Sequence, residues 1–172
     1  MVYFVRSIVV LGTLLAAVPA YAASPLLWLD QGVDLSGRQF HVAPVTAVDR
    51  AAEDEGATRI LHEKLSGELA ALGLLASATG DGTRRVIVTA TIMKYAQGSV
   101  AGRWVQTPEG AAHIIVRVML LDAESRALLG DMVSVQEVSS GGLFSIGAEK
   151  TVISDAAKEI ARGITERLKP AR

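Results

Sequence analysis

Hydrophobic and polar positions alternate with a period of two in three stretches of the second half of the chain, residues 84–95, 112–122 and 128–138. A period of two predicts strands that bury one face, and such strands are typical of an antiparallel sheet. A shorter alternating stretch, Gln39–Val45, predicts a further strand that ends near Pro44. The side chains expected on the buried face are Val86, Val88, Ala90 and Ile92, then Ile114, Val116, Val118 and Leu120, and then Val133 and Val135.

Two other stretches repeat apolar residues at helical spacing and predict amphipathic helices. The first is expected to begin at Asp49 as N-cap and to end at Gly73, after about six turns. The second includes Val152–Leu168 and places Glu159 among the polar residues on its water side. The two stripes are Ala57, Ile60, Leu61, Leu65, Leu69 and Leu72, and Val152, Ile153, Ala156, Ala157, Ile160, Ala161, Ile164 and Leu168.

One stripe on each helix and one apolar face on the sheet fit together as two layers. The expected fold class is therefore α+β, in the order β-α-β-β-β-α. An antiparallel sheet of about four strands would carry both helices on one face. The first strand–helix–strand unit is either a direct crossover or one that skips a strand, and we favour the second. We expect residues 23–37 to be irregular and residues 38–172 to form a single domain.

The first 22 residues have the features of a secretory signal peptide. Arg6 precedes an uncharged apolar run, residues 8–18, and Ala20-Tyr21-Ala22 supplies the small residues of a cleavage site. The run is short for a membrane span, which needs about 20 apolar residues. We therefore expect cleavage after Ala22, a periplasmic location and no stable membrane anchor, rather than an uncleaved anchor. Without a cysteine the chain has no lipobox, so we expect that it is not a lipoprotein.

Composition narrows the functional classes. The chain has 172 residues, is 50% hydrophobic, and balances 17 Lys and Arg against 18 Asp and Glu. This balance excludes intrinsic disorder and gives no electrostatic reason to expect nucleic acid as a partner. The absence of cysteine excludes disulfides and thiolate catalysis.

No residue pattern indicates an enzyme, a metal site or a cofactor. His41, His62 and His113 lack the spacing of metal ligands, and no GxSxG motif is present. The acidic residues cluster in predicted turns and in a first helical turn, where capping and solvation explain them. We therefore predict no cofactor and no catalytic residue.

Two glycine-containing connections are the candidate partner-binding loops. In residues 96–109 the candidates are Gly98, Arg103 and Trp104, because a connection this long is unusual and an Arg beside a Trp is typical of interface anchors. The alternative is that Trp104 extends a strand and covers the core. In residues 139–147 the candidates are Gly141, Gly142, Leu143 and Phe144. This second loop is alternatively a plain connection packed on the sheet edge, or an anion site at a helix N-terminus.

Several stretches resemble a bacterial exported family, domain-of-unknown-function family 4410. The resemblance spans residues 86–161, and its more specific parts are the Arg-Trp pair, Arg103-Trp104, and Gly141-Gly142-Leu143-Phe144. The other matching stretches are residues 88–92, 98–102, 110–113, 118–123 and 128–129, together with Ala156, Ala157, Ile160 and Ala161. The resemblance implies an envelope protein, often a lipoprotein, with no established activity. The missing cysteine departs from that pattern, and residues 105–109 replace a more glycine-rich run.

These observations favour a non-enzymatic envelope module that binds another envelope protein or an outer-membrane component through its loops and an exposed strand edge. A carrier of a small hydrophobic ligand or lipid is the alternative, and it requires an apolar cavity of at least about 300 Å³. A cell-wall hydrolase is the second alternative, and it requires two convergent acids in a cleft. The partner, the strand order and the oligomeric state are not determined by these patterns.

Overall fold

The computed structural model describes residues 27–50, 52, 56–76, 85–98, 111–138 and 148–168. The predicted signal peptide and its cleavage site lie outside these residues. In chain order the elements are β1 (Trp28–Leu29), β2 (Gln39–Val42), β3 (Thr46–Ala47), α2 (Ala57–Ala71), β4 (Arg85–Ala96), β5 (Ala112–Asp122), β6 (Leu128–Val138) and α4 (Ala148–Leu168).

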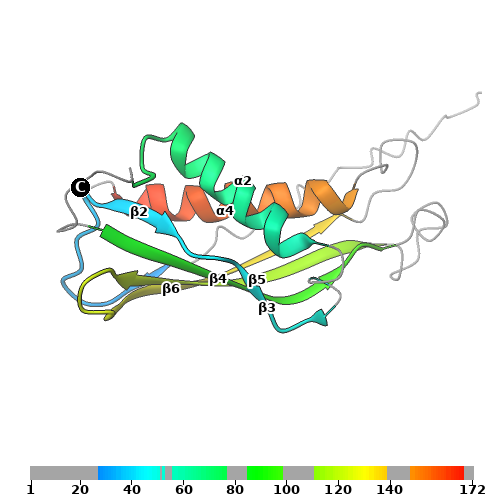
Figure 1. Ribbon diagram of the computed structural model, residues 1–172, viewed down its shortest axis with the longest axis horizontal. Coiled ribbons are helices and arrows are strands. Elements are labelled where there is room, and N and C mark those ends of the chain that lie inside the picture. The colour runs from blue at the N-terminus through cyan, green and yellow to red at the C-terminus, as the bar shows by residue number, and fades with distance from the viewer. Residues whose placement is uncertain are drawn as a thin grey trace, which may run out of the picture.

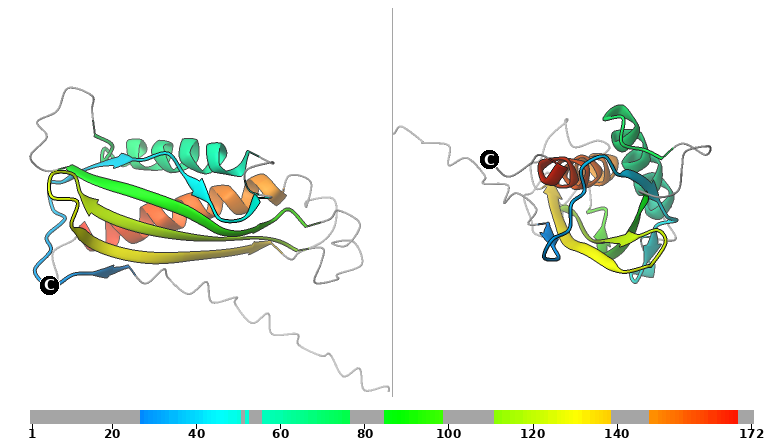
Figure 2. Two further views of the ribbon diagram at one scale, coloured as in Figure 1. Left: turned by 60° about the horizontal axis from the view of Figure 1, so that its bottom comes forward. Right: turned by 90° about the vertical axis from the view of Figure 1, so that its left-hand side faces the viewer.

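The strands form one sheet in the order β1-β6-β5-β4-β2, and β3 pairs with β4 off this path. Both helices lie on the same side of the sheet, as the end-on view in Figure 2 shows. The predicted α+β fold with two helices on one face is confirmed. The sheet has six strands rather than about four because two strands of two residues each, β1 and β3, extend it.

The sheet is mixed rather than purely antiparallel. Strands β4, β5 and β6 pair antiparallel, as predicted, but β2 and β3 lie parallel to β4. Gln39 pairs with Arg85 and Val42 with Val88, so the β2–α2–β4 unit is a direct crossover. The expectation that it skips a strand was wrong. Because β5 occupies one edge of β4, the other edge is open to β2, and α2 makes the connection on the covered face (Figure 1).

Helix α2 begins later than predicted. Its N-cap is Gly56, which has a left-handed backbone (φ 70°), and the helix runs for 15 residues, about four turns. Asp49 is therefore not its N-cap. The Asp49 carboxylate instead accepts a hydrogen bond from the Tyr95 backbone N–H at 3.0 Å, next to an irregularity in the β4–β5 pairing. The predicted C-terminus is confirmed, because Gly73 takes φ 69° and Leu74 N–H bonds to the Leu69 carbonyl at 2.9 Å.

The core lies between the sheet and the two helices. The predicted inward residues of β4, β5 and α4 are buried, apart from Leu168, which is partly buried, and Leu61, Leu65 and Leu69 of α2 are fully buried against them. Residues 27–37, part of the segment expected to be irregular, contribute strand β1 and two core leucines, Leu27 and Leu35. No helix among the described residues has the length and hydropathy of a membrane span.

The predicted facing of β6 was wrong. Val133 and Val135 are 50% and 60% exposed, whereas Met132 and Ser134 point into the core. The register explains this facing. Val118 pairs with Met132 and Val116 with Ser134, and because Val116 and Val118 face the helices, their partners do too.

The assignment of Glu159 to the water side of α4 was also wrong. Its side chain is buried and accepts hydrogen bonds from Ser134 Oγ and Gln136 Nε2, both on β6. A carboxylate in this position is tolerable because two donors satisfy it. The inward hydroxyl of Ser134 therefore accounts for the inward position of Glu159.

Candidate functional site

The two candidate loops leave the same end of the sheet. Ala96, at the end of β4, pairs with His113, and Ala112 pairs with Val138, at the end of β6. The connections from β4 to β5 and from β6 to α4 therefore start close together. Of the predicted partner-binding residues, Gly98 is described and has φ 64°, a conformation that favours glycine. The others, Arg103, Trp104, Gly141, Gly142, Leu143 and Phe144, lie outside the described residues.

The sheet face opposite the helices is more apolar than the sequence pattern indicated. We call it the open face and define it by Trp28 of β1, Arg117 of β5, and Asp131, Val133 and Val135 of β6. Among the described elements, no helix covers this face, and the left view of Figure 2 looks onto the sheet from this side. Trp28 is 52% exposed, which is comparable to Val133 and Val135. Exposed large apolar side chains gathered on one face are typical of interaction surfaces.

The open face was missed in the sequence because β6 is apolar on both faces. One signal does distinguish them. Asp131, Val133, Val135 and Glu137 occupy alternate positions and therefore lie on one face of the strand. A face that carries an acidic residue at each end is expected to be exposed to solvent.

An ion pair lies within this face. Arg117 Nη2 lies 2.6 Å from Asp131 Oδ2, and Arg117 Nε lies 3.1 Å from the same oxygen. The two residues are diagonal neighbours across β5 and β6, because Arg117 pairs directly with Val133. The hydrogen bond that Arg117 donates to the Asp131 carboxylate, together with the negative charge of that carboxylate, raises the pKa of Arg117 above its ordinary value. The pair lines a hollow of about 550 Å³ together with Trp28, Met132 and Val133.

The edge of the sheet beside the open face is only partly paired. Strand β1 pairs with β6 at Gly130 and Asp131, and β6 continues to Val138. Within the described ranges, no strand pairs with residues 132–138 on the side away from β5. Unpaired backbone N–H and C=O groups along an edge strand are a template for strand addition.

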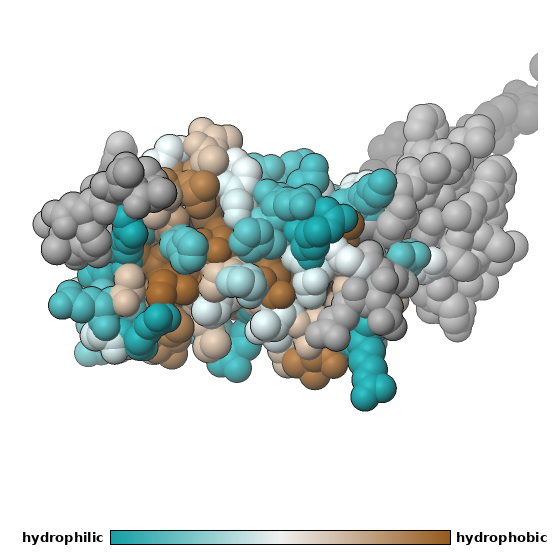
Figure 3. Space-filling view, viewed as in Figure 1, coloured by the Kyte–Doolittle hydropathy of each residue, from teal (hydrophilic) through white to brown (hydrophobic). Residues whose placement is uncertain are grey.

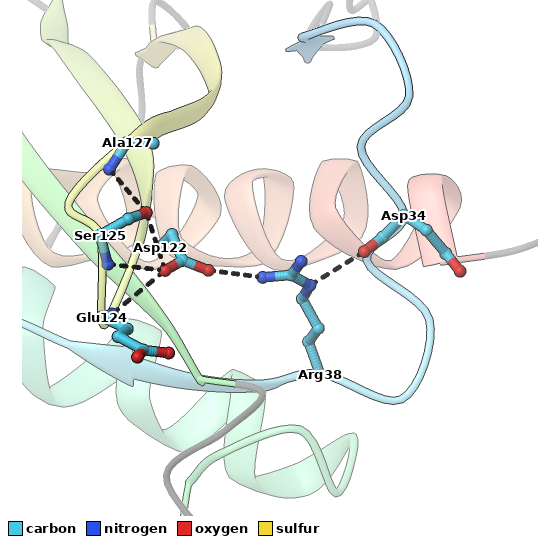
Figure 4. Close-up of polar contacts among 6 residues, drawn as sticks. All are labelled: Asp34, Arg38, Asp122, Glu124, Ser125 and Ala127. Atoms are coloured by element: carbon cyan, nitrogen blue, oxygen red, sulfur yellow. Dashed lines mark hydrogen bonds and ion pairs between the residues drawn. The ribbon is translucent and has the colours of Figure 1, made fainter.

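The opposite end of the β5–β6 hairpin is held by a polar cluster around Asp122, shown in Figure 4. Asp122 Oδ1 accepts hydrogen bonds from Ser125 N–H at 2.9 Å and Glu124 N–H at 3.1 Å, and Arg38 Nη1 lies 3.0 Å from Oδ2. These bonds, led by the one from Ser125 N–H, lower the pKa of Asp122 to about 2. The cluster ties the predicted turn, which is confirmed, to the segment before β2. Its role is structural.

The described residues do not assemble a catalytic or metal-binding group. No cluster of three or more His, Asp or Glu side chains that could hold a metal occurs among them. His41 is exposed, His62 Nε2 lies 3.3 Å from the Val42 carbonyl oxygen, and His113 Nε2 is buried without a hydrogen-bond partner in the described ranges. The buried acid of α4, Glu159, is bonded to Ser134 and Gln136 rather than facing a second acid.

The comparisons with known proteins establish a shared fold. No family model matches the chain, and no curated protein matches it, so the resemblance to family 4410 stays a prediction. The solved PelC dodecamer from Paraburkholderia phytofirmans is 12% identical with a TM-score of 0.51, over 80% of this chain and 96% of that one. A DUF330-family protein from Xanthomonas campestris is 15% identical, also with a TM-score of 0.51, over 79% of this chain and 90% of that one. At these identities the likeness concerns the fold alone.

Proposed function

We propose that this chain is a non-enzymatic protein of the bacterial cell envelope that acts as an assembly module, and that its open face docks a second copy of the chain. The observation that carries the proposal is the exposure of Trp28, Val133 and Val135 beside the Arg117–Asp131 pair. Burying these side chains removes apolar area from water, which is the main driving force of protein association.

The proposed location rests on the sequence. The apolar run and the Ala-Tyr-Ala site of residues 1–22 support export to the periplasm, and the absence of the cysteine that a lipobox requires supports a protein without a lipid anchor. The fold likeness supports self-association indirectly, since the PelC structure of the same fold is a dodecamer. We propose a single α+β domain over residues 38–172, with residues 27–37 packed against it.

The loops that leave the end of the sheet form a second proposed contact. We propose that Arg103, Trp104 and the segment from Gly141 to Phe144 bind another envelope protein or an outer-membrane component. The adjacent ends of β4, β5 and β6 support this, because they direct both connections to one end of the molecule. A pull-down with the single variants Arg103→Ala and Trp104→Ala tests it. Loss of partner recovery supports the loop contact, and unchanged recovery with both variants contradicts it.

The two alternative functions each need a feature that the described residues do not supply. A hydrophobic-ligand carrier needs a cavity between sheet and helices, but the core side chains there, such as Leu61, Ile114 and Ile160, are fully buried against one another. A cell-wall hydrolase needs two convergent acids, and Glu159 has hydroxyl and amide partners instead.

Self-association through the open face is tested by measuring molar mass over a concentration series of the mature chain, residues 23–172. Val135→Lys should weaken the association at least about tenfold, because a charge is then buried in an apolar contact. Lysine is common on exposed edge strands, so this variant should still fold. The matched control is Leu72→Lys, since Leu72 is 48% exposed but lies at the end of α2. A monomeric wild type, or equal weakening by the control, contradicts the proposal.

A further inference from the structure

A groove between the outer surfaces of α2 and α4 concentrates positive charge. Arg59 and Lys64 of α2 and Lys150 and Lys158 of α4 line it, with Thr151 and Ser154 between them. Its volume is about 460 Å³. In Figure 3, hydrophilic residues gather over the right-hand part of the helix pair, where α2 and the beginning of α4 lie together. This surface is on the opposite side of the molecule from the open face.

The charge of the groove is local and unbalanced. The chain as a whole has a net charge of −1, yet four cations line this groove with one acid, Asp155. Asp155 Oδ1 lies 3.7 Å from Lys158 Nζ, and Arg59 pairs with Glu63 at 2.8 Å. Among the described side chains, none forms an ion pair with Lys64 or Lys150. Two ammonium groups, one from each helix, are therefore available to an anion.

The first turn of α4 adds to this potential. Lys150 is the third residue of the helix and therefore lies in its first turn. The partial positive charge at a helix N-terminus favours negative groups. Ser154, one turn further on, supplies a hydroxyl to the same groove. The groove thus offers cations and hydrogen-bond donors from two elements around one space.

We infer that this groove binds a phosphate group of an envelope ligand. Phosphate presents several strongly accepting oxygens around one centre, which matches ammonium and hydroxyl donors arriving from two helices, and lysine binds phosphate as a point charge. A nucleic acid is a poorer match because the rest of the chain is near neutral. The phosphate comes either from the headgroup of an anionic phospholipid or from a soluble phosphorylated sugar.

The inference is tested with two probes on the mature chain, residues 23–172. Glycerol 3-phosphate is titrated by NMR, and sedimentation is measured with vesicles of phosphatidylcholine containing phosphatidylglycerol, against vesicles of phosphatidylcholine alone. If both probes bind, the groove recognises the phosphate group itself. If only the anionic vesicles bind, the groove recognises a lipid headgroup. If neither probe binds, the inference is overturned.

The location is tested with matched double variants. Lys64→Gln with Lys150→Gln should weaken binding at least about tenfold, because two charge-assisted contacts are lost. Lys64→Arg with Lys150→Arg should retain binding. The control, Lys94→Gln with Arg167→Gln, removes the same charge from exposed positions outside the groove lining and should leave binding unchanged. Equal weakening by the control means that net charge alone is responsible and overturns the inference.

Discussion

Ser134 on β6 donates a hydrogen bond to the Glu159 carboxylate on α4, inside the layer between sheet and helices. Gln136, two residues along the same strand, donates a second bond to the same oxygen. This polar contact fixes α4 against one position of β6. It also fixes which face of β6 points outward, because Val133 and Val135 must face away from the helix when Ser134 faces toward it.

Glu159→Ala should destabilise the protein by about 2–3 kcal/mol, because it leaves the buried Ser134 hydroxyl and the Gln136 amide without their acceptor. Ser134→Ala alone should cost about 1 kcal/mol. Since the two residues are direct partners, the double variant should cost less than the summed single effects by at least about 0.5 kcal/mol. Urea unfolding of the four proteins measures this coupling. Strict additivity would show that the contact is energetically unimportant.

Gly130→Ala should detach β1 from the sheet edge. A Cβ at this position would lie 2.6 Å from the Trp28 carbonyl oxygen and 2.7 Å from Leu29 Cδ2, which forces the two strands apart. We expect a loss of about 2 kcal/mol, as in other overpacked sites. Hydrogen exchange of Asp30 N–H, which bonds to the Leu129 carbonyl at 3.0 Å, should accelerate. Unchanged exchange at Asp30 would show that the edge tolerates the methyl group.

Gly67→Ala should stabilise α2 by about 0.5–1 kcal/mol, because glycine is a poor helix former in an interior position. The added Cβ meets nothing within 4 Å. Gly73→Ala is the matched control. Its Cβ also meets nothing, but Gly73 has φ 69°, so this substitution should destabilise the helix end. Thermal unfolding of both variants should therefore shift in opposite directions.

Stability should fall in acid as Asp122 is protonated. The pKa of Asp122 is lowered to about 2 from 3.8, so in this interval the unfolded chain binds a proton that the native state does not. The contribution of Asp122 is present above pH 3.8 and is lost as the pH falls through about 2. In Asp122→Asn this part of the pH dependence should disappear. Unfolding midpoints from pH 6 down to about 2 provide the measurement, and identical slopes for both proteins would contradict the assignment.

Much of the fold follows from local periodicity. The strands at 112–122 and 128–138 were predicted with their observed bounds, and the stripe from Val152 to Ile164 is buried as expected. In a strand or a helix, the face on which a residue lies is set by its spacing from nearby residues in the chain, and this spacing can be read from the sequence. The end of α2 just before Gly73 was predictable for the same reason, because the left-handed residue that follows a helix is a local requirement.

The candidate site was less predictable. In residues 131–138 both faces of the strand carry apolar side chains, so periodicity alone does not show which face is buried. The selection depends on pairing with Val116 and Val118, residues of another strand. The groove between α2 and α4 likewise joins Lys64 to Lys150, which are distant in the chain.

The sequence by itself thus determined the presence of both helices, the three long strands, the α+β class and most of the apolar stripe of each helix. Only the tertiary structure decided the parallel crossover of β2 to β4, the outward facing of Val133 and Val135, and the burial of Glu159. The physical reason is the range of the interactions. Periodicity shows which residues favour burial and which favour solvent. The register of a strand and the burial of a polar group depend instead on which residue, distant in the chain, pairs with the strand or forms a hydrogen bond with the group.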